Sequence, residues 1–116
     1  MVSLSLYNIH EFSSDEITSG SDAAGPAVGT AWGLSAHLEL WHLVNSCGFT
    51  PAEALRSATS LPAKRFNFSD RGSIKEGLRA DLLLVEGNPL EDIDNMLNLR
   101  GVWAKGELCP VYKDLS

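Results

Sequence analysis

The sequence lacks the features that mark a secreted or membrane-spanning protein. Its two cysteines, Cys47 and Cys109, stand far apart and form no CxxC pair, which is typical of a reduced intracellular chain without disulfides. Residues 1–12 contain no Lys or Arg and only short apolar runs, unlike a secretory signal. No segment approaches the roughly 20 apolar residues that a membrane span needs. We therefore expect a cytoplasmic location and no membrane partner.

Positive charge is also scarce. Nine Lys and Arg face 15 Asp and Glu, giving a formal net charge of -6 and a sequence pI near 4.9. The basic residues are scattered singly among carboxylates and form no basic patch along the chain. Nucleic acid is therefore excluded as an expected partner.

The common metal-binding motifs are missing too, since the sequence contains no HxH, HExxH or CxxC. His37 and His42 are five residues apart on an expected helix, so they lie on different faces and cannot share a metal as residues three or four apart can. Glu39 and His42 have the three-residue spacing, but such a pair is usually a solvated contact. For His37 a buried or supporting role and a functional one remain open, and His10 has no partner.

What is present is enough for one globular domain, because 116 residues with 44% hydrophobic content can bury a core. A glycine-rich segment, residues 20–30, predicts a shaped loop. Asp22 lies in this loop between Gly20 and Gly25. An aspartate in such a turn most often hydrogen-bonds its own backbone, and no Gly-Lys-Ser/Thr follows to make a phosphate-binding loop.

Two helices and a further turn follow this loop. An amphipathic helix beginning near residue 34 and ending before Gly48 is predicted by apolar residues at helical spacing, namely Leu34, Leu38, Trp41 and Val44. Thr50, Pro51 and Glu53 predict the start of a second helix with a capping box. We expect this helix to bury Ala54, Leu55 and Ala58 and to stop near Ser60 before Pro62. Ser60 is expected to cap a short turn through Phe66.

The last third of the chain has the short apolar runs and turn residues that are typical of strands. We expect a short strand at Ser73–Ile74, a turn at 75–77, and a strand at 81–86 whose unbroken LLLV run predicts burial on both faces. Residues 101–104 and 107–108 are separated by Lys105-Gly106, which predicts a tight hairpin. The order of elements is thus loop, helices, then strands.

Three segments in this order resemble the carboxyl-terminal third of the amidohydrolase superfamily, in its imidazolonepropionase-like and prolidase-like branch. They are GSDAAGP, GLSAHLELWHLVNSCGFTPAEALRSATSLPAKRF and DRGSIKEGLRADLLLVEGNPLEDI. The resemblance implies an α/β fold: the end of a (β/α)8 barrel, with strand 8 and its following helices at 17–68, then strands of a small β-sandwich domain at 69–116. Residues 1–16 are an unassigned leader, which hints at a misplaced start or altered splicing.

The resemblance also implies roles for individual residues. Asp22 would stand at the end of the eighth barrel strand, residues 17–21, bind a divalent metal, most commonly zinc, and accept a proton from the attacking water. Gly20, Gly25 and Pro26 would shape the surrounding loop, and His37 and Glu39 would support the site. Asp81 would bond backbone donors rather than act in catalysis.

The family's other metal ligands have no counterpart in this chain, and a full barrel takes about 250 residues. Two hypotheses therefore stand. The chain is part of a hydrolase of carbon–nitrogen bonds in small-molecule or short peptide substrates, or it is a non-catalytic remnant that completes a partner chain. In the second case we expect no tight metal binding by this chain alone. A stand-alone binding module has no supporting feature, whereas the strand edge at 81–85 favours self-association.

Overall fold

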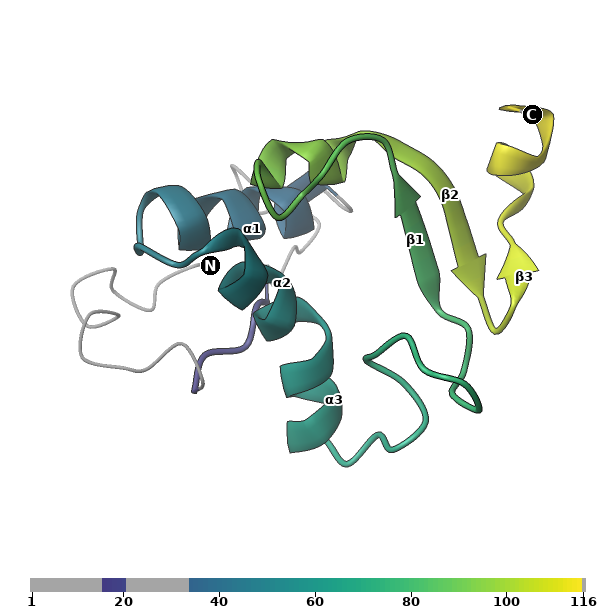
Figure 1. Cartoon of the computed structure of the whole chain (residues 1–116), viewed down its shortest axis with the longest axis horizontal. Helices are drawn as coiled ribbons and strands as arrows, with labels where there is room; N and C mark the ends of the chain where they lie inside the picture. The colour runs from purple at the N-terminus through teal and green to yellow at the C-terminus, as the bar shows by residue number, and fades with distance from the viewer. Residues whose placement is uncertain (1–15, 21–33, 116) are drawn as a thin grey trace, which may run out of the picture.

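The computed structural model describes residues 16–20 and 34–115. Three helices come first: α1 (Leu34–Asn45), α2 (Pro51–Ala58) and α3 (Ser60–Arg65). They are followed by β1 (Leu82–Val85), the 3-10 helix η2 (Ile93–Leu97), β2 (Leu99–Ala104), β3 (Glu107–Leu108) and a last 3-10 helix, η3 (Pro110–Leu115). The helices lie on one side and the sheet on the other (Figure 1). The expected order, helices and then strands, is confirmed.

None of the helices in the described part of the chain is long and apolar enough to span a membrane.

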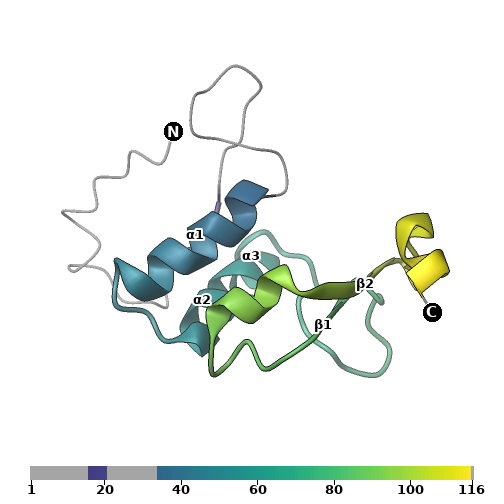
Figure 2. The ribbon, with the colours of Figure 1, turned by 90° about the horizontal axis from the view of Figure 1, so that it is seen from above.

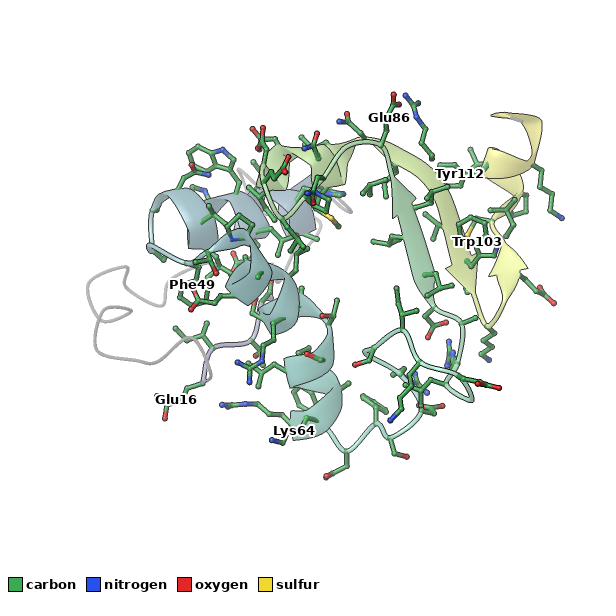
Figure 3. All side chains as sticks on the ribbon, in the orientation of Figure 1. Glu16, Phe49, Lys64, Glu86, Trp103 and Tyr112 are labelled. Carbon is green, nitrogen blue, oxygen red and sulfur yellow. The ribbon has the colours of Figure 1, made fainter. Side chains whose placement is uncertain are left out.

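A small apolar core lies where α1, α2 and η2 meet (Figure 2). Its buried members are Leu40, Leu43, Phe49, Ala54 and Ile93. Phe49, labelled in Figure 3, follows Gly48, whose φ of 76° lets the chain reverse after α1. The Phe49 amide then donates to the Leu43 carbonyl at 2.9 Å. The helix end predicted from Gly48 is therefore confirmed.

The buried face of α1 differs from the predicted one. The helix spans the expected residues, but Leu40 and Leu43 are its buried apolar side chains. Leu34, Leu38 and Trp41 are 50%, 43% and 40% exposed. These three lie on the side of α1 opposite Leu40 and Leu43, because residues at i, i+4 and i+7 share one face. Val44, the fourth residue of the predicted set, packs against the core. The prediction was wrong for the other three because α1 is apolar on two faces and α2 and η2 cover only one.

Helix α2 begins with the capping box that the sequence predicts. The Glu53 amide donates to the Thr50 side chain at 3.2 Å, and the Thr50 amide donates to Glu53 Oε2 at 2.8 Å. Ala54 is fully buried and Leu55 packs against the core. Ala58 is exposed, however, and Ser57 is buried in its place, with its hydroxyl donating to the Ala54 carbonyl at 2.6 Å. A serine can be buried there because this bond satisfies its hydroxyl.

Helix α3 starts one residue earlier than predicted. Ser60 is inside the helix, and the N-cap residue is Thr59, which makes no side-chain cap bond. The Thr59 hydroxyl instead donates to the Leu55 carbonyl at 2.7 Å, at the end of α2. Pro62 is the third residue of α3. It is tolerated because first-turn amides have no partner within a helix.

The sheet has the order β1-β2-β3 with antiparallel pairing throughout. The β1 strand is confirmed, but its predicted burial on both faces is wrong, since Leu83 and Leu84 are 54% and 52% exposed. These neighbours point to opposite faces, so both faces of β1 are open among the described residues. The expected strand at Ser73–Ile74 is not formed, and Ile74 is 89% exposed.

The hairpin between β2 and β3 is confirmed, and Asp81 fixes its turn. Lys105 and Gly106 have φ values of 54° and 83°, and two positive φ values are the signature of a type I′ hairpin turn. The Lys105 amide donates to Asp81 Oδ1 at 2.9 Å, and the Gly106 amide donates to the Ala80 carbonyl at 2.9 Å. Arg79 Nε lies 2.8 Å from Asp81 Oδ2. As predicted, Asp81 bonds a backbone donor.

The capping box gives a first test. Replacing Thr50 by Ala removes the acceptor for the Glu53 amide, so we expect the free energy of unfolding to fall by about 1 kcal/mol. Urea titration followed by far-ultraviolet circular dichroism measures this change. T50S is the matched control, because it keeps a hydroxyl and should retain most of the stability. An equal loss in T50S and T50A would contradict the capping role.

Asp81 gives a second test. The hydrogen bond from Lys105 and the Arg79 guanidinium lower the pKa of Asp81. A carboxyl whose pKa is lower in the folded than in the unfolded state stabilises the fold above its unfolded pKa, and this contribution is lost as the pH falls through the folded pKa. D81N should therefore show a smaller drop in stability between about pH 6 and about pH 2 than the wild type.

The free energy of unfolding of D81N and of the wild type is measured by urea titration at both pH values, with D70N as the control. The pKa of Asp70 is also lowered, chiefly by a hydrogen bond from Arg71, but Asp70 does not touch the Lys105 turn. The protection of the Lys105 amide, which is its exchange rate relative to the intrinsic rate at the same pH, should therefore fall in acid in D70N as in the wild type, and should depend less on pH in D81N. An unchanged pH dependence in D81N would rule out the proposed contact.

Candidate functional site

The structure describes the residues that flank the predicted acidic loop. Asp22 and Gly25 lie outside the described residues. Gly20, the last described residue before this gap, and α1, which follows it, carry the other predicted site residues. The described part of the predicted site therefore consists of Gly20, His37 and Glu39.

The segment formed by residues 16–20 is held against the helices. Ile17 packs on the apolar core, and the Ser19 amide donates to the Ser57 carbonyl at 2.8 Å. This segment, purple in Figure 1, runs beside α2. Its described residues form no ladder with another strand, and a β-strand needs a hydrogen-bonded neighbour. Its assignment as part of the eighth barrel strand stays a prediction.

Glu39 connects this segment to α1. Its side chain is half-buried, and this burial raises the pKa of the carboxyl. A hydrogen bond from the Gly20 backbone and the charge of His42 act in the opposite direction and favour the carboxylate. The structure thus brings together two of the predicted supporting residues, Gly20 and Glu39, although they are 19 positions apart in the sequence.

His37 is half-buried on α1, and its Nδ1 atom is buried without a hydrogen-bond partner among the residues that the structure describes. A buried polar atom in this state is uncommon. His42 is exposed, lies 3.4 Å from the Ser46 hydroxyl through Nδ1, and meets the Trp41 ring edge-on at 5.2 Å between centroids. Within residues 16–20 and 34–115, no group of three His, Cys, Asp or Glu side chains could hold a metal ion.

Both cysteines are free and half-buried. Burial raises the pKa of the Cys47 thiol, and the charge of Glu39 adds to this effect. Cys47 also packs against the apolar core. A raised pKa leaves less thiolate at neutral pH, which disfavours a nucleophilic role.

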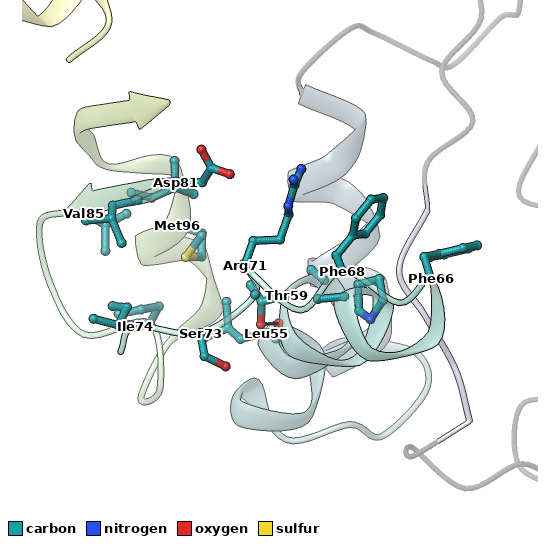
Figure 4. Close-up of a pocket in the computed structure, with 17 residues that line it drawn as sticks. Leu55, Thr59, Phe66, Phe68, Arg71, Ser73, Ile74, Asp81, Val85 and Met96 are labelled. Atoms are coloured by element: carbon teal, nitrogen blue, oxygen red, sulfur yellow. Dashed lines mark hydrogen bonds between the residues drawn. The ribbon is translucent and has the colours of Figure 1, made fainter. Parts of the chain in front are cut away.

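Sequence reasoning missed an open groove of about 660 Å³ between α2, α3 and β1 (Figure 4). Apolar side chains make up most of its lining, among them Leu55, Phe66, Ile74 and Leu83. Phe66 was expected at the end of a short turn and Ile74 in a short strand, so neither prediction indicated that these two side chains would line a shared groove.

The two charged residues of the groove are engaged in local contacts. The Arg71 guanidinium stacks on the Phe68 ring, 4.7 Å from its centroid, and pairs with Asp70 at 2.8 Å. Asp81 is bound by Lys105 and Arg79, as described above. These contacts fix loops. The groove therefore offers shape and apolar surface but no acid–base pair among its described residues.

Comparison with known proteins gives the chain a family. The model of the amidohydrolase family matches residues 8–109, beginning within the segment that sequence reasoning left unassigned. The chain is 36% identical over 76 residues to an imidazolonepropionase of Deinococcus deserti, covering 63% of this chain and 19% of that protein. It is 39% identical over 59 residues to the alpha-D-ribose 1-methylphosphonate 5-triphosphate diphosphatase of Escherichia coli, covering 51% and 14%.

A solved structure leads to the same family. A candidate prolidase from Bifidobacterium longum is 35% identical, with a TM-score of 0.63 over 72% of this chain and 22% of the other. The chain thus spans less than a quarter of the length of each of these relatives. The match extends from before the acidic loop to the last strand, β3, and confirms the resemblance seen in the sequence. The chain belongs to the amidohydrolase family.

Proposed function

We propose that the chain supplies the closing part of a metal-dependent amidohydrolase that acts on carbon–nitrogen bonds in amide or peptide-like substrates. One observation supports this most directly: the family match runs through residues 8–109 and so includes both Asp22 and the helices on which residues 16–20 are held. In this proposal Asp22 is the catalytic and metal-binding carboxylate of the chain, and His37 and Glu39 support it.

The described residues do not fit a metal by themselves. They provide no group of three suitable side chains, and a catalytic zinc usually takes about three protein ligands. A divalent metal would therefore need ligands besides the described ones, with Asp22 giving a single carboxylate. The chemistry proposed for this chain is limited to Asp22 as a carboxylate that binds or accepts a proton.

The substrate is proposed only as a class. The similar proteins differ in the reactions that their names describe, from an imidazolonepropionase to a triphosphate diphosphatase. Specificity in a shared fold depends on the particular site rather than on the fold. A substrate screen should therefore include N-acyl amino acids and dipeptides as candidate substrates. A nucleoside triphosphate should be included as a compound of a different class.

A second candidate is a non-catalytic subunit that completes a partner chain. Exposed apolar side chains on two elements favour it: Leu34, Leu38 and Trp41 on α1, and Leu83 and Leu84 on β1. Exposed apolar side chains that gather on one face of an element often mark an interface. This candidate differs from the first in needing no metal and no role for Asp22.

Metal content and size distinguish the two. If the chain takes part in metal chemistry, elemental analysis of material from a sizing column should find zinc or a related divalent metal at about one per site, and D22N should lose most of it. Hydrolysis of the dipeptide or N-acyl panel should fall at least about a hundredfold in D22N. D15N, a nearby carboxylate outside the family motif, is the matched control and should retain both.

Metal-free material with no hydrolysis would contradict the catalytic proposal for this chain and support the partner-completing one. Stoichiometric metal would support the catalytic proposal and contradict the partner-completing one. If the metal is found in a particle larger than one chain, several copies would contribute its ligands. Equal metal content in D22N and the wild type would remove Asp22 from the site.

A further inference from the structure

The edge of β1 that faces away from β2 has no partner strand in the described part of the chain. The sheet has the order β1-β2-β3, so β1 is an outer strand. The backbone groups of successive residues point alternately to the two edges of a strand. The Glu86 amide donates to the Asn98 carbonyl at 2.9 Å, on the β2 side. Leu84 therefore also faces β2, whereas Leu83 and Val85 direct their amides and carbonyls to the free edge.

The groove between β1 and the helices runs along this free edge. Leu82 and Leu83 both line the groove, although neighbouring residues of a strand point to opposite faces of the sheet. A groove beneath one face would be lined by only one of the two. Figure 4 shows Val85 of β1 on one side of the groove and Leu55 of α2 on the other. The free backbone groups of β1 thus open into a largely apolar groove of about 660 Å³.

The chemistry of this groove favours an extended polypeptide segment as its occupant. Backbone groups beside apolar surface need hydrogen-bonding partners, because leaving them unpaired costs free energy. A small apolar molecule would fill the groove without supplying these bonds. An extended segment pairs its main chain with the edge strand and packs its side chains on the walls. Arg71 and Asp81, the charged lining residues, have opposite signs and are both paired, so the groove suits an uncharged segment.

We propose that the groove binds one extended, uncharged and largely apolar strand, which joins the sheet at the free edge of β1. The proposal rests on the proposed function in one respect, because the strand is taken to come from the remaining length of the amidohydrolase to which this chain contributes. The similar proteins have more than three quarters of their length outside the part that this chain matches. A protein of that size has enough chain to supply such a strand.

A second copy of the chain fits this edge less well. Helices α2 and α3 lie on the side of β1 away from β2 (Figure 1). Pairing two β1 edges about a two-fold axis would bring the helices of each copy into the space of the other copy's sheet, since such a contact imposes the same geometry on both copies. The LLLV sequence of β1 also contains no Lys or Pro, the residues that commonly keep an exposed edge from pairing.

The test is an NMR titration of the chain with a short capped peptide of alternating Val and Thr. Both residue types favour strands, and neither is charged. With the peptide bound, amide exchange at Leu83 and Val85 should slow about tenfold or more, whereas Leu84, which faces β2, should change less than about twofold. The same peptide N-methylated at every interior amide keeps its side chains but cannot donate to the edge. It should bind at least about tenfold more weakly.

Two leucines of β1 provide a matched pair of variants. Leu83 lines the groove and Leu84 does not, although they are 54% and 52% exposed. L83K would place a charge in the apolar groove, so the affinity for the Val/Thr peptide should fall about tenfold or more. L84K places the same charge on the same strand, and its affinity should change less than about twofold. Circular dichroism establishes that each variant folds.

Three results would overturn the proposal: unchanged Leu83 and Val85 exchange at about 1 mM peptide, equal binding of the N-methylated peptide, or equal losses in L83K and L84K. A dimer on a sizing column that L83K abolishes would assign the groove to a second copy and also contradict it. If L83K does not fold, the two peptides on the wild type decide. Peptide binding by a chain that has neither metal nor hydrolytic activity would leave the groove assignment standing while the proposed function fails.

Discussion

The packing of Ile93 with Leu40 and Leu43 is the contact on which the rest of the described structure depends. It joins η2, which lies between two strands of the sheet, to α1, and Ala54 brings α2 into the same cluster. The long loop after α3 also joins the helices to the sheet, and it lines the groove between them. Because the cluster is small, single truncations of its leucines have a large relative cost. The position of residues 16–20 also depends on it, through Ile17.

The apolar residues outside this cluster follow a pattern that has a physical meaning. Helix α1 is apolar on two opposite faces, and β1 is apolar on both sides. A helix or strand with this composition is normally enclosed by other layers. The described residues cover one face of α1 and leave Leu83 and Leu84 on β1 half-exposed. The predicted place of α1, outside the last strand of a (β/α)8 barrel, would account for such residues, since a helix of a barrel lies between the strands and its neighbouring helices.

Local sequence signals were reliable where a residue type is required by one backbone feature, such as a helix cap, a helix end or a tight turn. Thr50 with Glu53, Gly48, and Lys105-Gly106 each predicted a feature that the structure has. Predictions of burial failed at α1, at Ala58 and at the LLLV strand, because burial depends on which other elements are present and not on the residues themselves. The Ser73–Ile74 strand failed for a similar reason, since two residues form a strand only where a neighbouring strand pairs with them. The groove and the Gly20–Glu39 contact involve residues too distant in sequence for periodicity to relate them.

The described carboxylates differ in the groups to which they bind. Glu53 closes a helix cap, Asp81 closes a hairpin turn, and Glu86 pairs with Arg100 at the exposed end of the sheet. Each of these contacts is explained by the local turn or strand it stabilises. Glu39 instead lies half-buried in the middle of a helix, where a carboxylate carries a desolvation cost and no cap needs it. A hydrogen bond from the Gly20 backbone and the charge of His42 favour its ionised form, so its surroundings both penalise and stabilise the charge.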